Sequence, residues 1–170
     1  MKLKLNILTV VLLAVMRLTA YAQSNYPVYV YPVLTPPYSL RLSDYCQPGS
    51  QRLTVMIQVR DAMITNLPVR LHIKMETLDG RGIESVPNPF RAMPIYLGGG
   101  QTQMLFGEDL APYFDIDNLI FKGYTKEQYR RTGQLPEGFY RITIEVRHFH
   151  TGRLISNQGI VMAWFALGKP

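Results

Sequence analysis

Alternating apolar and polar residues form the strongest pattern in this sequence, and the pattern occurs in three stretches. The clearest is LPEGFYRITIEVRHF, residues 135–149, which opens with a Pro-Glu-Gly turn and alternates from Tyr140 to Arg147. RLTVMIQVRD, residues 52–61, and LPVRLHIKMET, residues 67–77, repeat it. A period of two residues places alternate side chains on opposite faces of a β-strand. Each stretch therefore predicts a strand with one buried face.

The polar members of these strands would face outward, and most of the charged ones are basic. They are Arg52, Arg60, Arg70, His72, Lys74, Arg141 and Arg147, with Glu76 and Glu145 among them. If the three strands share a sheet, that face is basic, and its functional interpretation is a docking surface for an acidic partner or a glycan. The alternative, which the interspersed glutamates favour, is an ordinary solvated face.

Weaker signals cover the remaining chain. Residues 28–34 carry valines beside Pro27 and Pro32, and a proline donates no ladder hydrogen bond, so we expect an edge strand or an extended lead-in. Residues 95–106 predict two short strands around three glycines, and residues 154–167 are expected to pair with the opening strand. The two helix candidates are residues 107–114 and 125–133. In the second, Thr125 and Gln128 have capping-box spacing.

Several short strands, frequent turn signals and only fragments of helix predict an all-β fold with two short helices. We expect an antiparallel β-sandwich of the immunoglobulin or fibronectin-like type. The sequence has no strand–helix–strand rhythm that would favour a parallel sheet, and no internal repeat. We therefore predict a single domain over residues 23–170.

The first 22 residues have the three parts of a secretory signal peptide. Lys2 and Lys4 precede an apolar run over residues 5–16, and Ala20-Tyr21-Ala22 is a small-x-small cleavage site. The apolar run is shorter than the roughly 20 residues that span a bilayer. An uncleaved anchor is the alternative. The sequence predicts an exported protein, periplasmic or at the cell surface, with no direct membrane insertion after cleavage.

Cleavage would leave 148 of the 170 residues, enough for one domain with a core of its own. The signal holds three of the 18 basic residues, so 15 basic and 12 acidic residues remain, a net charge of +3. This mild charge does not indicate nucleic-acid binding.

Catalytic and cofactor motifs are missing from the sequence. It holds no GxSxG, HExxH or CxxC motif and no phosphate-binding glycine loop. Cys46 is the single cysteine, which excludes an internal disulfide. We interpret it as an unreactive thiol, with a covalent dimer or a catalytic role as alternatives. The expectation is a protein that is not an enzyme and takes no cofactor.

Metal-binding patterns are incomplete. His148 and His150 would share one face of a strand, but no third ligand accompanies them, so ordinary strand-end histidines are favoured over a zinc site. DIDN, residues 115–118, is similar to the start of a calcium loop. Ile120 and Lys126 stand where that loop requires Gly and Glu. A looser calcium site between loops stays open, and no metal site is predicted.

Tyrosines gather between residues 26 and 45, among four prolines. A tyrosine combines apolar area with a polar tip, which suits interfaces and sugar-binding platforms. The alternative is that these side chains pack along an edge strand. We predict Tyr29, Tyr31, Tyr38 and Tyr45 as the partner-binding residues.

Three stretches occur in order and are followed by AWFAL; they are YPVYVYPVLTPPYSLRLSDY, GEDLAPYF and GQLPEGFYRITIEVRHFHTGRLISN. Together they resemble the TANFOR domain. This is a family of exported β-rich modules of Bacteroidetes-type bacteria, and the resemblance covers the whole chain after the signal. It implies an export-linked surface or periplasmic module, found alone or at the front of large surface proteins with fibronectin-like repeats. It implies no enzymatic activity.

The chain departs from the family at one point. Many members carry a Cys pair on the last two strands, where this sequence has Thr143 and Ile160. The chain also stops at Pro170 without a sorting domain. We therefore expect either the module alone or a subunit of a larger assembly.

The resulting hypothesis is a non-catalytic exported module that docks onto a larger cell-envelope or surface protein through its tyrosine-rich segment. A glycan- or peptide-binding module is the alternative.

The signal peptide gives the first prediction. Because Ala20 and Ala22 fit signal peptidase, mass spectrometry of protein from the native envelope should find an N-terminus at Gln23. Recovery of a chain that still begins at Met1 would overturn it.

Overall fold

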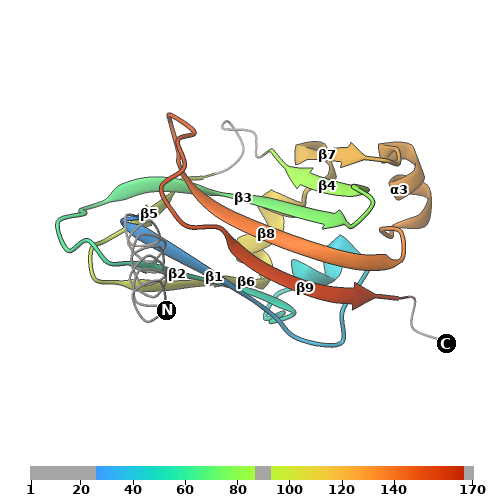
Figure 1. The fold of residues 1–170 in the computed structure, drawn as a ribbon, viewed down its shortest axis with the longest axis horizontal. Coiled ribbons are helices and arrows are strands. Elements are labelled where there is room, and N and C mark those ends of the chain that lie inside the picture. Colours follow the sequence, from blue (N-terminus) through green and yellow to red (C-terminus); the bar gives the residue numbers. More distant parts are fainter. Residues whose placement is uncertain (1–25, 87–92, 167–170) are drawn as a thin grey trace, which may run out of the picture.

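Two antiparallel β-sheets form the framework of the computed structural model, which describes residues 26–86 and 93–166 (Figure 1). The three-stranded sheet has the order β1 (Val28–Leu34), β2 (Leu53–Val59), β6 (Thr102–Phe106). The six-stranded sheet has the order β7 (Leu119–Lys122), β4 (Gly82–Ser85), β3 (Leu67–Thr77), β8 (Gly138–His148), β9 (Gly159–Phe165), and β5 (Ile95–Leu97) also pairs with β3. The predicted signal, residues 1–22, lies outside the described residues.

The centre of the larger sheet is the pairing of β3 with β8. Both strands have 11 residues, and their antiparallel register runs from Val69 opposite His148 to Thr77 opposite Tyr140. Both were predicted from the alternation of their side chains. In β8 the even-numbered residues from Tyr140 to Val146 are fully buried, as the alternation predicts.

One core fills the space between the two sheets. The inward residues of β1 and β2 join those of β3 and β8 in a single buried cluster. The predicted inward residues all lie in it; they are Leu53, Val55, Ile57, Val59, Val69, Leu71, Ile73, Met75, Tyr140, Ile142, Ile144 and Val146. The all-β prediction is thus confirmed at the level of two packed antiparallel sheets.

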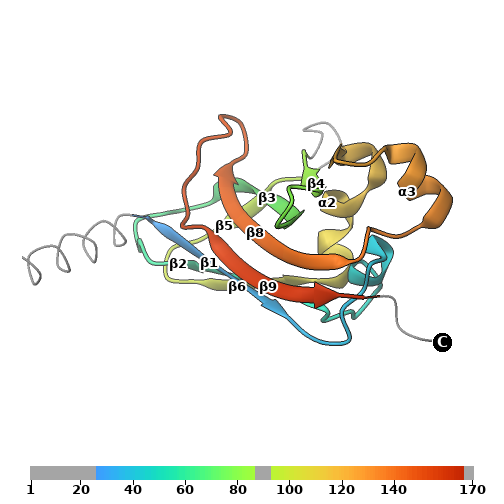
Figure 2. The same ribbon diagram turned by 45° about the vertical axis from the view of Figure 1, so that its right-hand side comes forward.

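The helices are short and lie at one end of the sheets (Figure 2). They comprise the 3₁₀ turns η1 (Leu42–Tyr45), η2 (Gly107–Leu110) and η3 (Ile116–Asn118) and the α-helices α2 (Ala111–Phe114) and α3 (Lys126–Thr132). The predicted capping box is present, because the Thr125 side chain accepts from the amide of Gln128 at 3.1 Å and the Gln128 side chain accepts from the amide of Thr125 at 2.7 Å. Gly133 ends the helix with a φ of 67°.

The closing strand has a different partner from the one expected. β9 pairs with β8 along its whole length; the segment just before β9 bridges β1 between Ser156 and Val28, and Gly159 at the start of β9 lies against Val30 and Pro32. There the Asn157 side chain bonds both the amide and the carbonyl of Val30, at 2.7 and 3.3 Å. β1 is an edge strand, as its prolines predict. A tight turn between β8 and β9 favours pairing within the hairpin over pairing with a distant edge.

The register of β8 gives a stability prediction. Ile144 is 0% exposed, so Ile144→Asp would bury an unpaired carboxylate at a cost of several kcal/mol, comparable with total stabilities of roughly 5–15 kcal/mol. The neighbouring Thr143→Asp is the control, because it places the same group on the outer face opposite Lys74. Circular dichroism should show loss of fold only in the first variant. Equal melting of both variants would show that the register is wrong.

Candidate functional site

The four predicted tyrosines divide between the surface and the core. Tyr45 is 1% exposed, and its hydroxyl donates to the carbonyl of Ser39 at 2.7 Å while its ring packs on Phe114. Burial raises the pKa of this hydroxyl well above its usual range. Tyr45 therefore belongs to the core, which corrects the expectation that all four tyrosines present their side chains on the surface.

Of the other three tyrosines, Tyr29 is buried, whereas Tyr31 and Tyr38 are exposed. Tyr29 is 9% exposed and lies beneath Arg60, whose guanidinium is 4.0 Å from the ring centroid. Tyr31 is 39% exposed and stacks on Tyr29 with ring centroids 6.4 Å apart. Tyr38 is 36% exposed and packs on the buried ring of Phe165. Tyr31 is thus a surface side chain that its neighbours hold in place.

Tyr31 belongs to an apolar patch on the outer face of the three-stranded sheet. It stands opposite Met56, which stands opposite Met104 on the next strand, so the three form one row across the sheet. Val33 lies on the same face two residues further along β1. Tyr31, Val33 and Met104 are 39, 44 and 53% exposed. We call Tyr31, Val33, Met56 and Met104 the tyrosine face.

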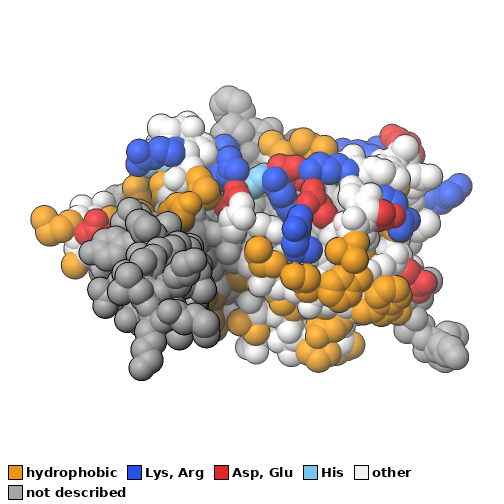
Figure 3. All heavy atoms as spheres, viewed as in Figure 1, with side chains coloured by type: hydrophobic (Ala, Val, Ile, Leu, Met, Phe, Trp, Pro, Cys, Tyr) orange, Lys and Arg blue, Asp and Glu red, His pale blue; other side chains and the backbone are white. Residues whose placement is uncertain are grey.

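A second apolar surface runs along β9. Ile160, Met162 and Trp164 are 49, 56 and 62% exposed and lie on the outer side of the strand. Figure 3 shows hydrophobic side chains gathered over this strand. We call these residues the β9 row. Sequence reasoning did not single out the row, although GIVMAWF is apolar on both faces, which is typical of a strand covered on both sides.

The outer face of the six-stranded sheet is an ion-pair network around glutamates. Glu84 accepts from His72 at 2.7 Å and from Lys122 at 2.8 Å. Glu145 accepts from Arg147 at 2.7 Å and lies 3.2 Å from the other ring nitrogen of His72. Carboxylates only accept, so both His72 contacts are hydrogen bonds when both ring nitrogens carry a proton.

The interpretation of a shared basic face required all three strands to lie in one sheet, and β2 lies in the other sheet. Arg52 and Arg60 flank β2 of the other sheet, whereas Arg141 and Arg147 face Glu76 and Glu145. The remaining three basic residues predicted for this face, Arg70, His72 and Lys74, lie on β3. Glu145 is also 4% exposed, where alternation predicted an open position.

Hydrogen bonds and charges keep these carboxylates ionised. Burial by itself would raise the pKa of Glu145, but hydrogen bonds from Arg147, Gln158 and His72 outweigh it and lower the pKa. The pKa of Glu84 is lowered in the same way, with burial opposed by bonds from Lys122 and His72 and by the charge of Lys74. The network therefore acts as one charge-compensated unit.

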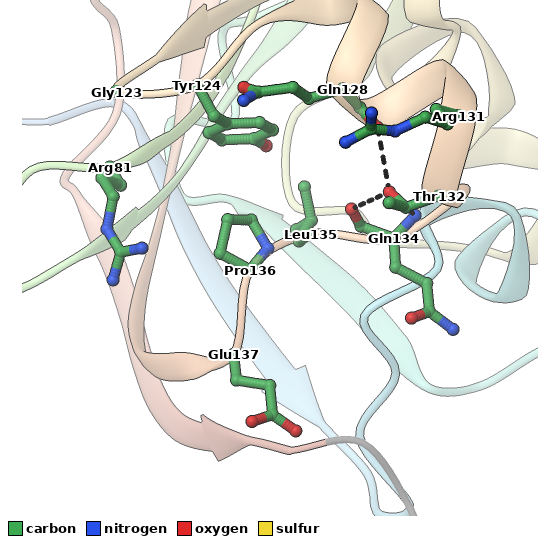
Figure 4. Close-up of a pocket in the computed structure, with 10 residues that line it drawn as sticks. All are labelled: Arg81, Gly123, Tyr124, Gln128, Arg131, Thr132, Gln134, Leu135, Pro136 and Glu137. Carbon is green, nitrogen blue, oxygen red and sulfur yellow. Dashed lines mark hydrogen bonds between the residues drawn. The ribbon is translucent and has the colours of Figure 1, made fainter.

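A pocket of about 470 Å³ lies between α3, the turn after it and the start of β4 (Figure 4). Leu135 and Pro136 stand at its centre in this view, with Arg81 and Arg131 on opposite sides. The Tyr124 hydroxyl is buried without a hydrogen-bond partner among the described residues, and burial raises its pKa. The pocket offers an apolar floor surrounded by cationic and amide groups and by the carboxylate of Glu137.

Other candidate positions are occupied by local contacts. Burial raises the pKa of the Cys46 thiol to about 11, which makes it a poor nucleophile. Asp115 accepts from the amide of Asp117, whose carboxylate bonds Lys126 at 2.7 Å. Among the described residues, no group of three or more His, Cys, Asp or Glu side chains is placed to hold a metal ion. In the same part of the chain, every helix is too short or too polar to cross a bilayer.

A comparison with known protein families and with curated proteins found no match.

The glutamate network gives a pH-dependent prediction. Glu145→Gln should lower the free energy of unfolding at neutral pH by about 1–3 kcal/mol, because an amide group replaces a buried acceptor. The folded state lowers the pKa of Glu145 below its ordinary 4.5, so its stabilisation is complete above that pH and is lost as the pH falls through the folded value.

Urea unfolding from neutral to acidic pH provides the measurement. The difference in the free energy of unfolding between wild type and Glu145→Gln should become smaller below about pH 4.5. The exposed Glu108→Gln is the control and should change stability little. A difference that stays constant down to acidic pH would contradict the assigned network.

Proposed function

We propose that this protein is a non-catalytic exported module that docks onto a larger cell-envelope or surface protein. The observation that carries the proposal is the row of Tyr31, Met56 and Met104 on the outer face of the three-stranded sheet. The signal-like N-terminus and the resemblance to the TANFOR family point in the same direction. An immunoglobulin- or fibronectin-like arrangement belongs to the same proposal, and two antiparallel sheets around one core support it.

The tyrosine face has the chemistry of a docking surface. Aromatic and methionine side chains are enriched at the centres of protein interfaces, where they desolvate large areas with little loss of rotamer entropy. Tyr31 is stacked on Tyr29, and Arg60 covers Tyr29 in turn. A side chain that is already ordered loses less entropy on binding. The exposed Gln58 lies beside the row on β2, as at the polar rim of an interface.

Glycan or peptide binding is the second candidate, and the pocket beside α3 favours it. Tyr124 and Pro136 offer apolar surface, while Gln128, Gln134 and Arg131 offer hydrogen-bond donors at its wall. Retention of the purified protein on immobilised envelope polysaccharide, lost in Arg131→Ala, would favour this function over docking.

The docking proposal predicts a selective loss of partner binding. The double variant Tyr31→Ala, Met104→Ala should recover much less envelope partner on copurification, because buried aromatic anchors often contribute about 2 kcal/mol or more to binding. Both side chains are exposed in the free protein, so melting should stay near that of wild type.

Tyr96→Ala is the matched control, since Tyr96 is 56% exposed but lies on β5 of the other sheet. It should recover the partner as well as wild type does. Full recovery by the folded double variant would remove the tyrosine face from consideration.

A further inference from the structure

The open edge of β9 follows from the hydrogen bonding of β8. The amide of Val146 bonds the Ser156 hydroxyl and its carbonyl accepts from Ile155, so Val146 directs its backbone groups toward β9. Successive residues of a strand direct their backbone N–H and C=O groups to opposite sides. Each even-numbered residue of β8 is therefore hydrogen-bonded to the residue opposite it on β9. The backbone groups of Ile160, Met162 and Trp164 consequently point away from β8, and no hydrogen bond of theirs occurs within the described residues.

Three other edge strands, β1, β6 and β7, carry features that hinder pairing with another chain. In β1, Pro32 has no amide hydrogen, and the Asn157 side chain bonds both backbone groups of Val30. In β6, the carboxylate of Asp109 accepts from the amide of Phe106 at 3.2 Å. In β7, Phe121 packs against Tyr129 of α3, so the helix stands beside that edge. Natural proteins use such devices to prevent strands from pairing with another chain.

Beyond Gly159, which lies against Val30 and Pro32 of β1, β9 has none of these devices. Its sequence GIVMAWF contains no charged residue and no proline. The three residues that direct backbone groups outward are also those whose side chains form the β9 row. An exposed apolar strand with free backbone groups is a template for another strand.

We propose that β9 pairs antiparallel with β9 of a second copy of this chain, with the two-fold axis at Met162. In this register Met162 lies opposite Met162 of the second copy, and Ile160 of each copy lies opposite Trp164 of the other. The outward backbone groups of all three residues are then hydrogen-bonded between the copies. The six strands of each copy would then form one continuous sheet.

The edge of β9 is complementary to its own copy, so we infer that the strand that binds it is β9 of a second chain. A neutral apolar strand meets its own copy without repelling charges, and Ile opposite Trp is a favourable cross-strand pair of a β-branched and an aromatic residue. Closed two-fold pairing is the commonest symmetry of soluble oligomers. The neighbouring Arg141, opposite Met162 on β8, lies 3.8 Å from Glu76, so its charge is compensated within its own copy.

Light scattering coupled to size exclusion tests the dimer. Wild type should have twice the mass of one chain at high concentration and approach one chain on dilution. Met162→Lys should halve the mass at high concentration, because it places two like charges at the axis. Met104→Lys is the matched control and should stay dimeric, since Met104 is similarly exposed on an edge strand of the other sheet.

Met162→Pro gives a second route to the same result. Its amide hydrogen points away from β8, so the proline removes an edge donor and leaves the β8–β9 bonds in place. Melting followed by circular dichroism verifies that each variant is folded. Wild type at single-chain mass at every concentration, or a folded Met162→Lys that stays dimeric, would overturn the proposal.

Cysteine cross-linking tests the register. In a Cys46→Ser background, Met162→Cys should form a covalent dimer under mild oxidation, because directly opposed Cα atoms lie about 5.5 Å apart. Ile160→Cys should link much more slowly, because the two copies of residue 160 would be about 13 Å apart along the strands. Equal cross-linking at both positions would overturn this register. Loss of the dimer would leave the docking proposal for the tyrosine face untouched, since that proposal depends on a different sheet.

Discussion

The pairing of β3 with β8 is the interaction on which the rest of the structure depends. These are the two longest strands; β4, β5 and β9 each pair directly with one of them, and β7 joins the sheet through β4. Their inner faces supply the buried residues that the three-stranded sheet covers. Their outer faces supply His72, Glu145 and Arg147, which hold the ion-pair network together. The β3–β8 ladder thus positions both the apolar residues of the core and the charged residues of the outer face.

The ladder also explains where apolar surface can remain exposed. The centre of the outer face is occupied by compensated charges from β3, β4 and β8. Apolar side chains therefore collect away from it, on β9 and on the smaller sheet. A surface divided in this way presents two separate apolar areas, and each has its own geometry: the tyrosine face offers side chains, whereas β9 offers backbone groups as well.

Local sequence signals were enough to predict the elements whose causes are local. Period-two alternation identified β2, β3 and β8 with their inward residues, and the Thr125 and Gln128 pair identified α3. Tyr45 was placed on the surface because the η1 turn that buries it gave no signal in the sequence. Its burial depends on packing with Phe114, a residue distant in the chain.

Features that need the register between strands were beyond sequence reasoning. Glu145 occupies an outward position, yet His72 and Gln158 from other parts of the chain bury it. The row of Tyr31, Met56 and Met104 exists only because three strands align these positions. β9 was expected beside β1 because an apolar run without alternation carries no information on its partner.

Trp164 is the single tryptophan of the sequence, and it lies on the outer side of β9 rather than in the core. Its fluorescence therefore reports on water at one sheet edge and not on the packing between the sheets. Unfolding would move this indole between two hydrated environments and change its emission little. Burial of Trp164 by another strand placed against β9 would shift its fluorescence emission to shorter wavelengths. The intrinsic fluorophore is thus a sensor of association, and tyrosine signals or circular dichroism are the reporters of folding.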